Sequence, residues 1–164
     1  MKVIENFLDK KTHKTISDVV CSKKFPLYYN DTTANNADTS DYMFTHVFYE
    51  DGKQTSIFLS DVLIPLLGKL SFDRLIRAKL NFYTKKPKHI KTAYHVDFSN
   101  KHTVALYSIN TNNGYTLFKN GDSVKSVANQ LVLFDGKLEH CSVNQTDENV
   151  RLNININLEC KENY

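Results

Sequence analysis

The sequence contains no tryptophan and little glycine, proline or cysteine. Its 164 residues include only 5 Gly and 3 Pro, which argues against collagen-like repeats and low-complexity disorder, and 41% are hydrophobic, as in a globular protein. The three cysteines, Cys21, Cys141 and Cys160, are odd in number and form no Cys-x-x-Cys pair. They suggest neither a disulfide framework nor a thiolate zinc site, so we expect a reducing, cytoplasmic environment.

A long apolar segment and a strong charge of one sign are also absent. No run approaches the roughly 18 apolar residues of a membrane span, and the first ten residues mix acids with bases, unlike a signal peptide. We therefore expect no membrane partner. With 21 Lys and Arg against 18 Asp and Glu, the net charge of +3 does not by itself indicate a nucleic-acid partner. The length fits one domain, residues 1–164.

The first part of the chain carries short strand and helix patterns. Residues 3–8 predict a strand, and Asp9 is a candidate cap for a helix that ends near Cys21. The polar stretch 30–41 predicts an exposed loop, and residues 43–50 predict a strand that ends in an Asp-Gly turn.

A second helix is indicated by apolar residues that recur at intervals of three and four. They are Leu59, Val62, Leu63, Leu66, Leu67 and Leu70. Pro65 lies inside this pattern, which predicts either a late start or a kink. We interpret the apolar side of this helix as core packing.

Beyond Arg74 the pattern changes to at least six strand-like segments separated by turns such as Asp135-Gly136. Two of these strands alternate strictly between apolar and polar residues. The polar members are Arg77, Lys79, Asn81 and Tyr83 in the first strand, and Arg151, Asn153, Asn155 and Asn157 in the last. A barrel-like sandwich would turn these polar faces toward an inner pocket, while helices from the first part of the chain cover the apolar backs.

Three residues could bind one metal ion. His95 and Asp97 are two positions apart, so on a strand both side chains leave the same face. His140 follows 43 positions after Asp97, far enough for the chain to cross an antiparallel sandwich and return beside them. Two imidazoles and one carboxylate match the facial triad that binds non-heme Fe(II).

An anion-binding group follows the third candidate ligand. Arg151 lies eleven residues after His140, on the polar face of the last strand, where its guanidinium could bind a carboxylate through two parallel hydrogen bonds. Tyr83 could donate its phenol proton to the same carboxylate or to the substrate.

Asp135 is better explained as a turn residue, and Cys141 as buried packing. The remaining histidines are interpreted as surface or hydrogen-bonded residues: His13, His46, His89 and His102.

The series His95-x-Asp97, His140 and Arg151 resembles the signature of the 2-oxoglutarate and Fe(II)-dependent oxygenases. It is most similar to the prolyl-4-hydroxylase-like branch, which includes small stand-alone members found in marine phages and bacteria. Further similar segments span most of the chain: Val3-Ile4-Glu5-Asn6-Phe7-Leu8, Phe25-Pro26-Leu27-Tyr28-Tyr29, Arg77-Ala78-Lys79-Leu80-Asn81-Phe82-Tyr83, Asn112-Asn113-Gly114-Tyr115-Thr116 and Leu133-Phe134-Asp135-Gly136.

The resemblance implies an α+β, mainly β fold, with a double-stranded β-helix (a cupin-like jelly roll) over residues 74–160. Residues 1–73 would supply supporting strands and helices packed on one sheet. His95, Asp97 and His140 would bind Fe(II), and Arg151, supported by Tyr83, would bind the distal carboxylate of 2-oxoglutarate. Ascorbate is a candidate reductant. The implied reaction hydroxylates a C–H bond and releases succinate and CO2. Collagen-type hydroxylases usually have a lysine in place of Arg151, so the substrate does not follow from this resemblance.

The substrate class therefore stays open between three interpretations. A peptidyl proline or a similar protein, peptide or amino-acid substrate is the first, with Asn81 and Asn153 as candidates for the pocket wall. A nucleic acid is the second, suggested by a cluster of lysines: Lys79, Lys85, Lys86, Lys88 and Lys91. Against it, the demethylases of this superfamily usually have a second arginine where this chain has Asn157. The third is a jelly-roll binding or structural module without catalysis. The sequence predicts no oligomeric state.

Overall fold

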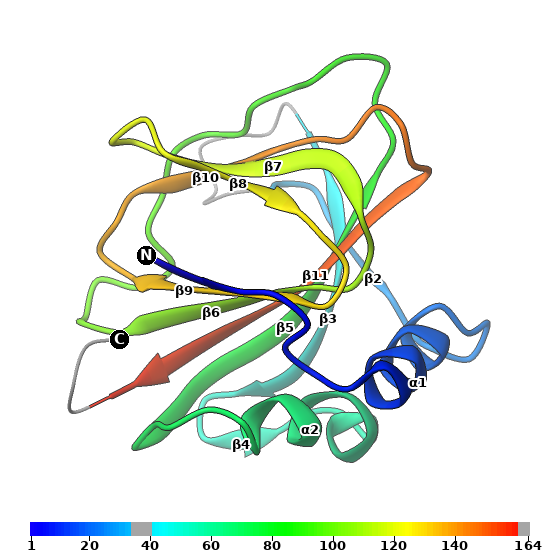
Figure 1. Cartoon of the computed structure of the whole chain (residues 1–164), viewed down its shortest axis with the longest axis vertical. Helices are drawn as coiled ribbons and strands as arrows, with labels where there is room; N and C mark the ends of the chain where they lie inside the picture. Colours follow the sequence, from blue (N-terminus) through cyan, green and yellow to red (C-terminus); the bar gives the residue numbers. More distant parts are fainter. Residues whose placement is uncertain (34–40, 161–164) are drawn as a thin grey trace.

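The computed structural model describes residues 1–33 and 41–160 and consists mainly of two facing antiparallel sheets (Figure 1). The large sheet has the strand order β1 (Lys2–Ile4), β9 (Gln130–Asp135), β6 (Thr103–Ser108), β11 (Val150–Glu159), β5 (Arg74–Thr84), β3 (Met43–Glu50) and β2 (Tyr28–Asn30), and β4 (Lys53–Gln54) pairs with β3. The small sheet has the order β10 (His140–Val143), β7 (Asn112–Phe118) and β8 (Ser123–Ser126).

Helices cover the outer face of the large sheet, on the side away from the small sheet (Figure 1). They are α1 (Lys10–Val20), the π-helical segment η1 (Leu59–Leu63) and α2 (Ile64–Leu67). Ile16 of α1 and Leu63 of η1 are fully buried in one apolar cluster with Leu80 of β5 and Ile154 of β11. This packing confirms the prediction that the helices cover the apolar backs of the alternating strands.

The inner face of the large sheet is polar where β5 and β11 pair. These strands run antiparallel with Arg151 opposite Tyr83 and Asn153 opposite Asn81. Because side chains alternate along a strand, Leu152 and Ile154 face the helices while Arg151 and Asn153 face the small sheet. A second apolar cluster joins the two sheets beside this polar region, formed mainly by Val104, Leu106, Phe118, Val132 and Phe134. The expected mainly β jelly roll is confirmed.

The first strand is shorter than predicted. It ends at Ile4 instead of residue 8, because Asn6 adopts a positive φ of 50° that breaks the extended conformation. Helix α1 begins as predicted: an Asp9 Oδ1 atom accepts a hydrogen bond of 2.9 Å from the backbone N–H of Thr12. Strand β2 includes the beginning of the loop predicted at 30–41, and residues 34–40 of that loop lie outside the described residues.

The predicted second helix is interrupted at its proline. The chain forms a π-helical segment up to Leu63, and a short α-helix begins at Ile64 with Pro65 in its first turn. A proline is accepted there because the first N–H groups of a helix need no intrahelical acceptor. The helix ends at Leu67, before Leu70, and Leu70 packs against the core from the following turn. In the described residues no helix combines the length and the apolar character needed to cross a membrane.

One residue departs from the predicted alternation of β5. A register shift between Asn157 and Leu158 of β11 pairs these residues with Arg77 and Leu75, which leaves Ile76 without a partner. Leu75 therefore packs against the main apolar cluster in the place predicted for Ile76.

The tight turn after β9 gives a stability prediction. A Cβ atom at Gly136 would clash with the His102 ring, at a distance of 2.2 Å. That ring is buried, and its Nδ1 atom forms a hydrogen bond with the Asn100 carbonyl, so it cannot easily move away. Gly136→Ala should therefore lower the free energy of unfolding by about 1–3 kcal/mol, measured by urea denaturation. Gly68→Ala is the control, because its Cβ would meet only Ile64 O at 3.5 Å. Equal stability of the two variants would contradict this explanation.

Candidate metal centre

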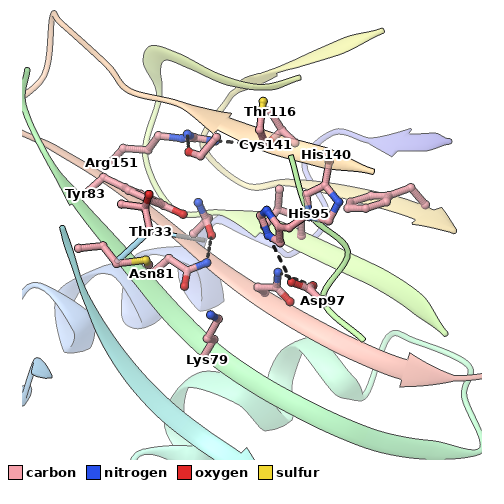
Figure 2. Close-up of a pocket in the computed structure, with 16 residues that line it drawn as sticks. Thr33, Lys79, Asn81, Tyr83, His95, Asp97, Thr116, His140, Cys141 and Arg151 are labelled. Atoms are coloured by element: carbon pink, nitrogen blue, oxygen red, sulfur yellow. Dashed lines mark hydrogen bonds and ion pairs between the residues drawn. The ribbon is translucent and has the colours of Figure 1, made fainter. Parts of the chain in front are cut away.

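The candidate site is a cavity between the two sheets (Figure 2). Its floor is the polar face of β5 and β11, and its opposite wall comes from β7 and β10. In Figure 2, His95, Asp97 and His140 lie on one side of the cavity, and Arg151 and Tyr83 lie on the other. The structure thus brings all five of these predicted residues to one cavity.

One nitrogen from each histidine and one oxygen of Asp97 all lie within 4.8 Å of one another. The segment with His95 and Asp97 does not form the regular strand that the sequence predicted. Isolated β-bridges join this part of the chain to β10. One of these bridges pairs His95 with His140: each backbone N–H donates to the carbonyl of the other residue, at 2.9 and 3.0 Å. The main chain therefore holds the two imidazoles side by side, with ring centroids 4.7 Å apart.

Hydrogen bonds orient both imidazoles for metal binding. His95 Nδ1 lies 3.3 Å from the Ala93 carbonyl, and His140 Nδ1 lies 3.0 Å from the Leu138 carbonyl. A carbonyl oxygen only accepts, so each Nδ1 carries a proton, and Nε2 is the ring nitrogen that is left to bind a metal ion. Burial, followed by the nearby His140, lowers the pKa of His95, which favours the neutral imidazole that a metal ion requires.

The carboxylate of Asp97 is held by two amides of β11. Asn157 Nδ2 donates to Asp97 Oδ2 at 2.7 Å, and Asn155 Nδ2 donates to the same oxygen at 3.0 Å. Burial raises the pKa of Asp97, but these hydrogen bonds and the nearby His140 and Arg77 together lower it to about 2. Asp97 is therefore ionised, with Oδ1 lying 3.7 Å from His95 Nε2.

The guanidinium of Arg151 is buried and has no carboxylate within ion-pair distance among the described residues. It donates to the hydroxyls of Ser126 (2.8 Å), Ser142 (2.5 Å) and Thr116 (3.3 Å), and to the Val143 carbonyl (3.2 Å). Arginine has five N–H donors, so one N–H on Nη2 remains for a ligand. A buried charge without a counter-ion is costly, and an anion in this cavity would offset that cost.

Tyr83 and the two predicted wall asparagines also face the cavity. The Tyr83 ring lies 5.4 Å from the Arg151 guanidinium carbon, and burial raises the pKa of its phenol, so it stays a protonated donor. Asn81 Nδ2 donates to Asn153 Oδ1 at 2.9 Å, while Asn81 Oδ1 is buried without a hydrogen-bond partner among the described residues. That oxygen can accept from water or from a bound molecule.

Sequence reasoning missed three residues of this site. Asn155 and Asn157 orient the carboxylate, although the sequence had already placed both on the polar face of the last strand. Arg77 lies behind the same carboxylate: its Nη2 is 3.7 Å from Asp97 Oδ1, and its guanidinium carbon lies 4.6 Å from the Phe98 ring centroid. The alternating pattern contained the signal, because it had already placed Arg77, Asn155 and Asn157 on the polar faces that turn toward the pocket.

The predicted non-ligands have other contacts. Asp135 Oδ1 accepts from the backbone N–H of Lys137, as a turn residue does, and burial raises the pKa of the fully buried Cys141 thiol. Among the described residues the remaining histidines do not line the cavity. Each hydrogen-bonds a hydroxyl or a carbonyl elsewhere: His13 to Tyr107, His46 to Pro26 and Ser56, His89 to Asn144, and His102 to Asn100.

No family profile and no curated protein matches the sequence. Solved structures do match its fold. A prolyl hydroxylase from Trichoplax adhaerens, in complex with a peptide fragment of the hypoxia inducible factor oxygen degradation domain, is 14% identical; the match covers 96% of this chain and 82% of that one, with a TM-score of 0.64. The chain has the fold of the 2-oxoglutarate-dependent oxygenases.

Two more structures with this oxygenase fold are close to this chain in size. A prolyl-4-hydroxylase from Pseudomonas putida is 13% identical over 96% of this chain and 91% of that one, with a TM-score of 0.62. A viral collagen prolyl hydroxylase from Paramecium Bursaria Chlorella virus-1, in a 2-oxoglutarate complex, is 9% identical over 98% and 96%, with a TM-score of 0.60. The oxygenase fold therefore extends over almost the whole chain, and the likeness lies in the backbone far more than in the sequence.

The ionised state of Asp97 gives a pH prediction for the metal-free protein. Its folded pKa of about 2 lies below the ordinary value of 3.8, so it stabilises the fold above the ordinary pKa, and this contribution is lost as the pH falls toward 2. Between pH 5 and pH 2, the free energy of unfolding should fall by ~2 kcal/mol more in the wild type than in Asp97→Asn. Urea denaturation at several pH values measures this difference, and parallel curves would contradict it.

Proposed function

We propose that the chain is an Fe(II)- and 2-oxoglutarate-dependent oxygenase that hydroxylates a C–H bond of a peptide or amino-acid substrate. The observation that carries this proposal is that one cavity contains both a candidate metal triad and a candidate anion-binding guanidinium. Two imidazoles and an ionised carboxylate lie within 4.8 Å of one another, and the same cavity contains the buried guanidinium of Arg151, which has no carboxylate partner among the described residues. A metal triad alone fits several chemistries, and the added anion site favours a dicarboxylate cosubstrate beside the metal.

The donor set fits Fe(II). His95, His140 and Asp97 offer two imidazole nitrogens and one carboxylate oxygen, the set that binds non-heme Fe(II) and leaves coordination positions open. The second carboxylate oxygen is occupied by Asn155 and Asn157, so the carboxylate has one oxygen for the ion. When bound, Fe(II) with 2-oxoglutarate and dioxygen supplies the oxidising power, and the cosubstrate leaves as succinate and CO2.

The surroundings of Arg151 fit the far carboxylate of 2-oxoglutarate. The guanidinium offers one remaining N–H, and the hydroxyls that accept from it, on Ser126, Ser142 and Thr116, keep their own protons for donation. Tyr83 adds a protonated phenol from the neighbouring strand. Together they form a site with several donors and one fixed positive charge, which suits a carboxylate.

The protein's contribution to this chemistry is position and charge. The hydrogen bonds of the Nδ1 atoms orient both imidazoles, and the amides from β11 hold Asp97 ionised and in one orientation. No side chain has to remove a proton from the substrate carbon. The walls of the cavity keep the reacting groups apart from bulk water.

A peptidyl proline is the first substrate to test, because the solved structures with this fold include prolyl hydroxylases. The nucleic-acid interpretation is weakened by the contacts of the lysine cluster. Lys86 pairs with Asp41 at 2.5 Å, Lys85 donates to the Asp147 carbonyl, and Lys91 lies 5.0 Å from the Tyr94 ring centroid. These lysines already have partners within the chain.

Ligand binding tests the oxygenase proposal against a non-catalytic jelly roll. Mn(II) together with 2-oxoglutarate, each at about 100 times its dissociation constant, should stabilise the protein by at least ~2.7 kcal/mol in a thermal unfolding experiment. His95→Ala should lose this response. With Fe(II) under air, the protein should convert 2-oxoglutarate to succinate. If saturating Mn(II) and 2-oxoglutarate leave the unfolding temperature unchanged, the proposal is wrong.

Replacing Arg151 should separate the cosubstrate site from the metal site. Arg151→Met keeps much of the side-chain volume but removes the buried charge, so the dissociation constant of 2-oxoglutarate should rise by about 10- to 150-fold. The dissociation constant of Mn(II) should change little. Isothermal titration calorimetry measures both constants, and Arg74→Met, which changes an exposed arginine of the neighbouring strand β5, is the control. Equal weakening of both ligands would contradict the assigned role.

A further inference from the structure

A second cavity of about 160 Å³ adjoins the metal triad, with room for roughly five water molecules. It shares His95 and Asp97 with the cavity described above, so a molecule bound in it would lie beside the metal. Its other walls are mostly polar, and they include Asn30, Thr45, Arg77 and Lys79. This cavity is therefore placed to receive the substrate, and it is lined by two cationic side chains.

Only one of these two cations has partners. Arg77 approaches Asp97 at 3.7 Å and Glu50 at 4.0 Å, and it stacks on Phe98. Lys79 is partly buried and has neither a hydrogen bond nor an ion pair with any of the described residues. Burial, followed by repulsion from Arg77, lowers the pKa of the Lys79 ammonium. A partly desolvated ammonium without a partner beside a cavity is a binding group for an anion.

Counted over the described residues, the charges of the loaded site also leave one positive charge unmatched. Fe(II) contributes two positive charges, and Arg151, Arg77 and Lys79 contribute one each. Asp97 and Glu50 contribute one negative charge each, and 2-oxoglutarate contributes two. Five positive charges thus face four negative ones. Asp97 and Glu50 attract both Arg77 and Lys79, but only Arg77 lies within ion-pair distance of them. Since Arg151 is assigned to the cosubstrate, Lys79 is the cation that has no ion-pair partner among the described residues.

We propose that the substrate carries a carboxylate close to the carbon that is oxidised, and that Lys79 binds this carboxylate. The inference rests on the proposed oxygenase function and specifies its substrate class. A carboxylate carries one negative charge, which balances a single ammonium, whereas a phosphate would bring up to two. Thr45 can add a second donor, because its hydroxyl accepts from Asn30 Nδ2 at 2.7 Å and retains its own proton.

This assignment changes the order of the candidate substrates. A proline inside a peptide has no carboxylate of its own, so it leaves Lys79 unpaired. A free amino acid, a chain-terminal residue, or an aspartate or glutamate side chain each places a carboxylate within a few bonds of an oxidisable carbon. These sources share one chemistry, and comparison of a free amino acid with the same residue blocked at both ends distinguishes them.

The binding test uses the Zn(II) protein saturated with 2-oxoglutarate, in which the cosubstrate site is filled and no turnover occurs. Lysines are labelled with ¹³C at Cε, and the Lys79 signal is identified by its loss in Lys79→Met. Propionate is the probe, with propionamide and inorganic phosphate for comparison. Propionate should shift the Lys79 signal saturably, and propionamide, which has the same shape but no charge, should not. Lys88→Met, which alters an exposed lysine of the same cluster, should leave the response intact.

Three results of this titration would overturn the inference. They are no shift with propionate, an equal shift with propionamide, and tighter binding of phosphate than of propionate. A fourth contrary result is a loss of 2-oxoglutarate affinity in Lys79→Met as large as that in Arg151→Met, because Lys79 would then serve the cosubstrate. If the protein binds no 2-oxoglutarate at all, the oxygenase proposal itself fails, which separates the two failures.

Turnover supplies the second readout. Free amino acids and their end-blocked counterparts are screened for a mass gain of one oxygen atom. Lys79→Met should lower kcat/KM for a carboxylate substrate by about 10- to 100-fold, mainly through KM, and Lys79→Arg should restore part of it. Lys88→Met, which alters an exposed lysine outside both cavities, should leave kcat/KM unchanged. A preference for end-blocked peptides that is equal in wild type and Lys79→Met would overturn the inference.

Discussion

The pairing of β5 with β11 at the centre of the large sheet determines both the stability of this protein and the placement of its site. Each strand sends apolar side chains such as Leu80 and Ile154 to the helices and polar ones such as Asn81 and Asn153 to the cavity. A shift of one residue in either strand would exchange these faces and place amides in the apolar cluster. The same register that buries the core therefore aligns the cavity floor, so a change of register in either strand would disturb both.

The desolvation cost of the buried polar groups in this cavity is largely offset because most of them form hydrogen bonds with one another. The amides of β11 hold the Asp97 carboxylate, and three hydroxyls hold the Arg151 guanidinium. Three groups without a partner among the described residues face the cavity: one N–H of Arg151, the carbonyl oxygen of Asn81 and the ammonium of Lys79. The Oδ1 atom of Asn155, whose amide nitrogen holds Asp97, is a further buried oxygen without one. This division between satisfied and unsatisfied groups indicates a site built before its ligands arrive.

The periodic parts of the fold could be predicted from the sequence, and the irregular parts could not. Strict alternation predicted the two central strands and their two faces, because a period of two is set by strand geometry. The early end of β1 depends on the positive φ of Asn6, and the bulge at Ile76 depends on pairing with a distant strand. Neither conformation is visible in a local pattern, because tertiary contacts select it.

For the site, spacing alone suggested His95, Asp97 and His140, and the structure brings these residues together by a route the sequence did not predict. The partners of Asp97 could have been inferred from the polar face of β11, but which asparagines reach it depends on the path of an irregular segment. That segment is joined to β10 through the reciprocal main-chain hydrogen bonds between His95 and His140. This link uses no side-chain atom, so the imidazole at either position can be exchanged for another metal-binding side chain while the two backbone positions keep their separation. The paired main chain at His95 and His140 is therefore suited to the engineering of centres for other metals.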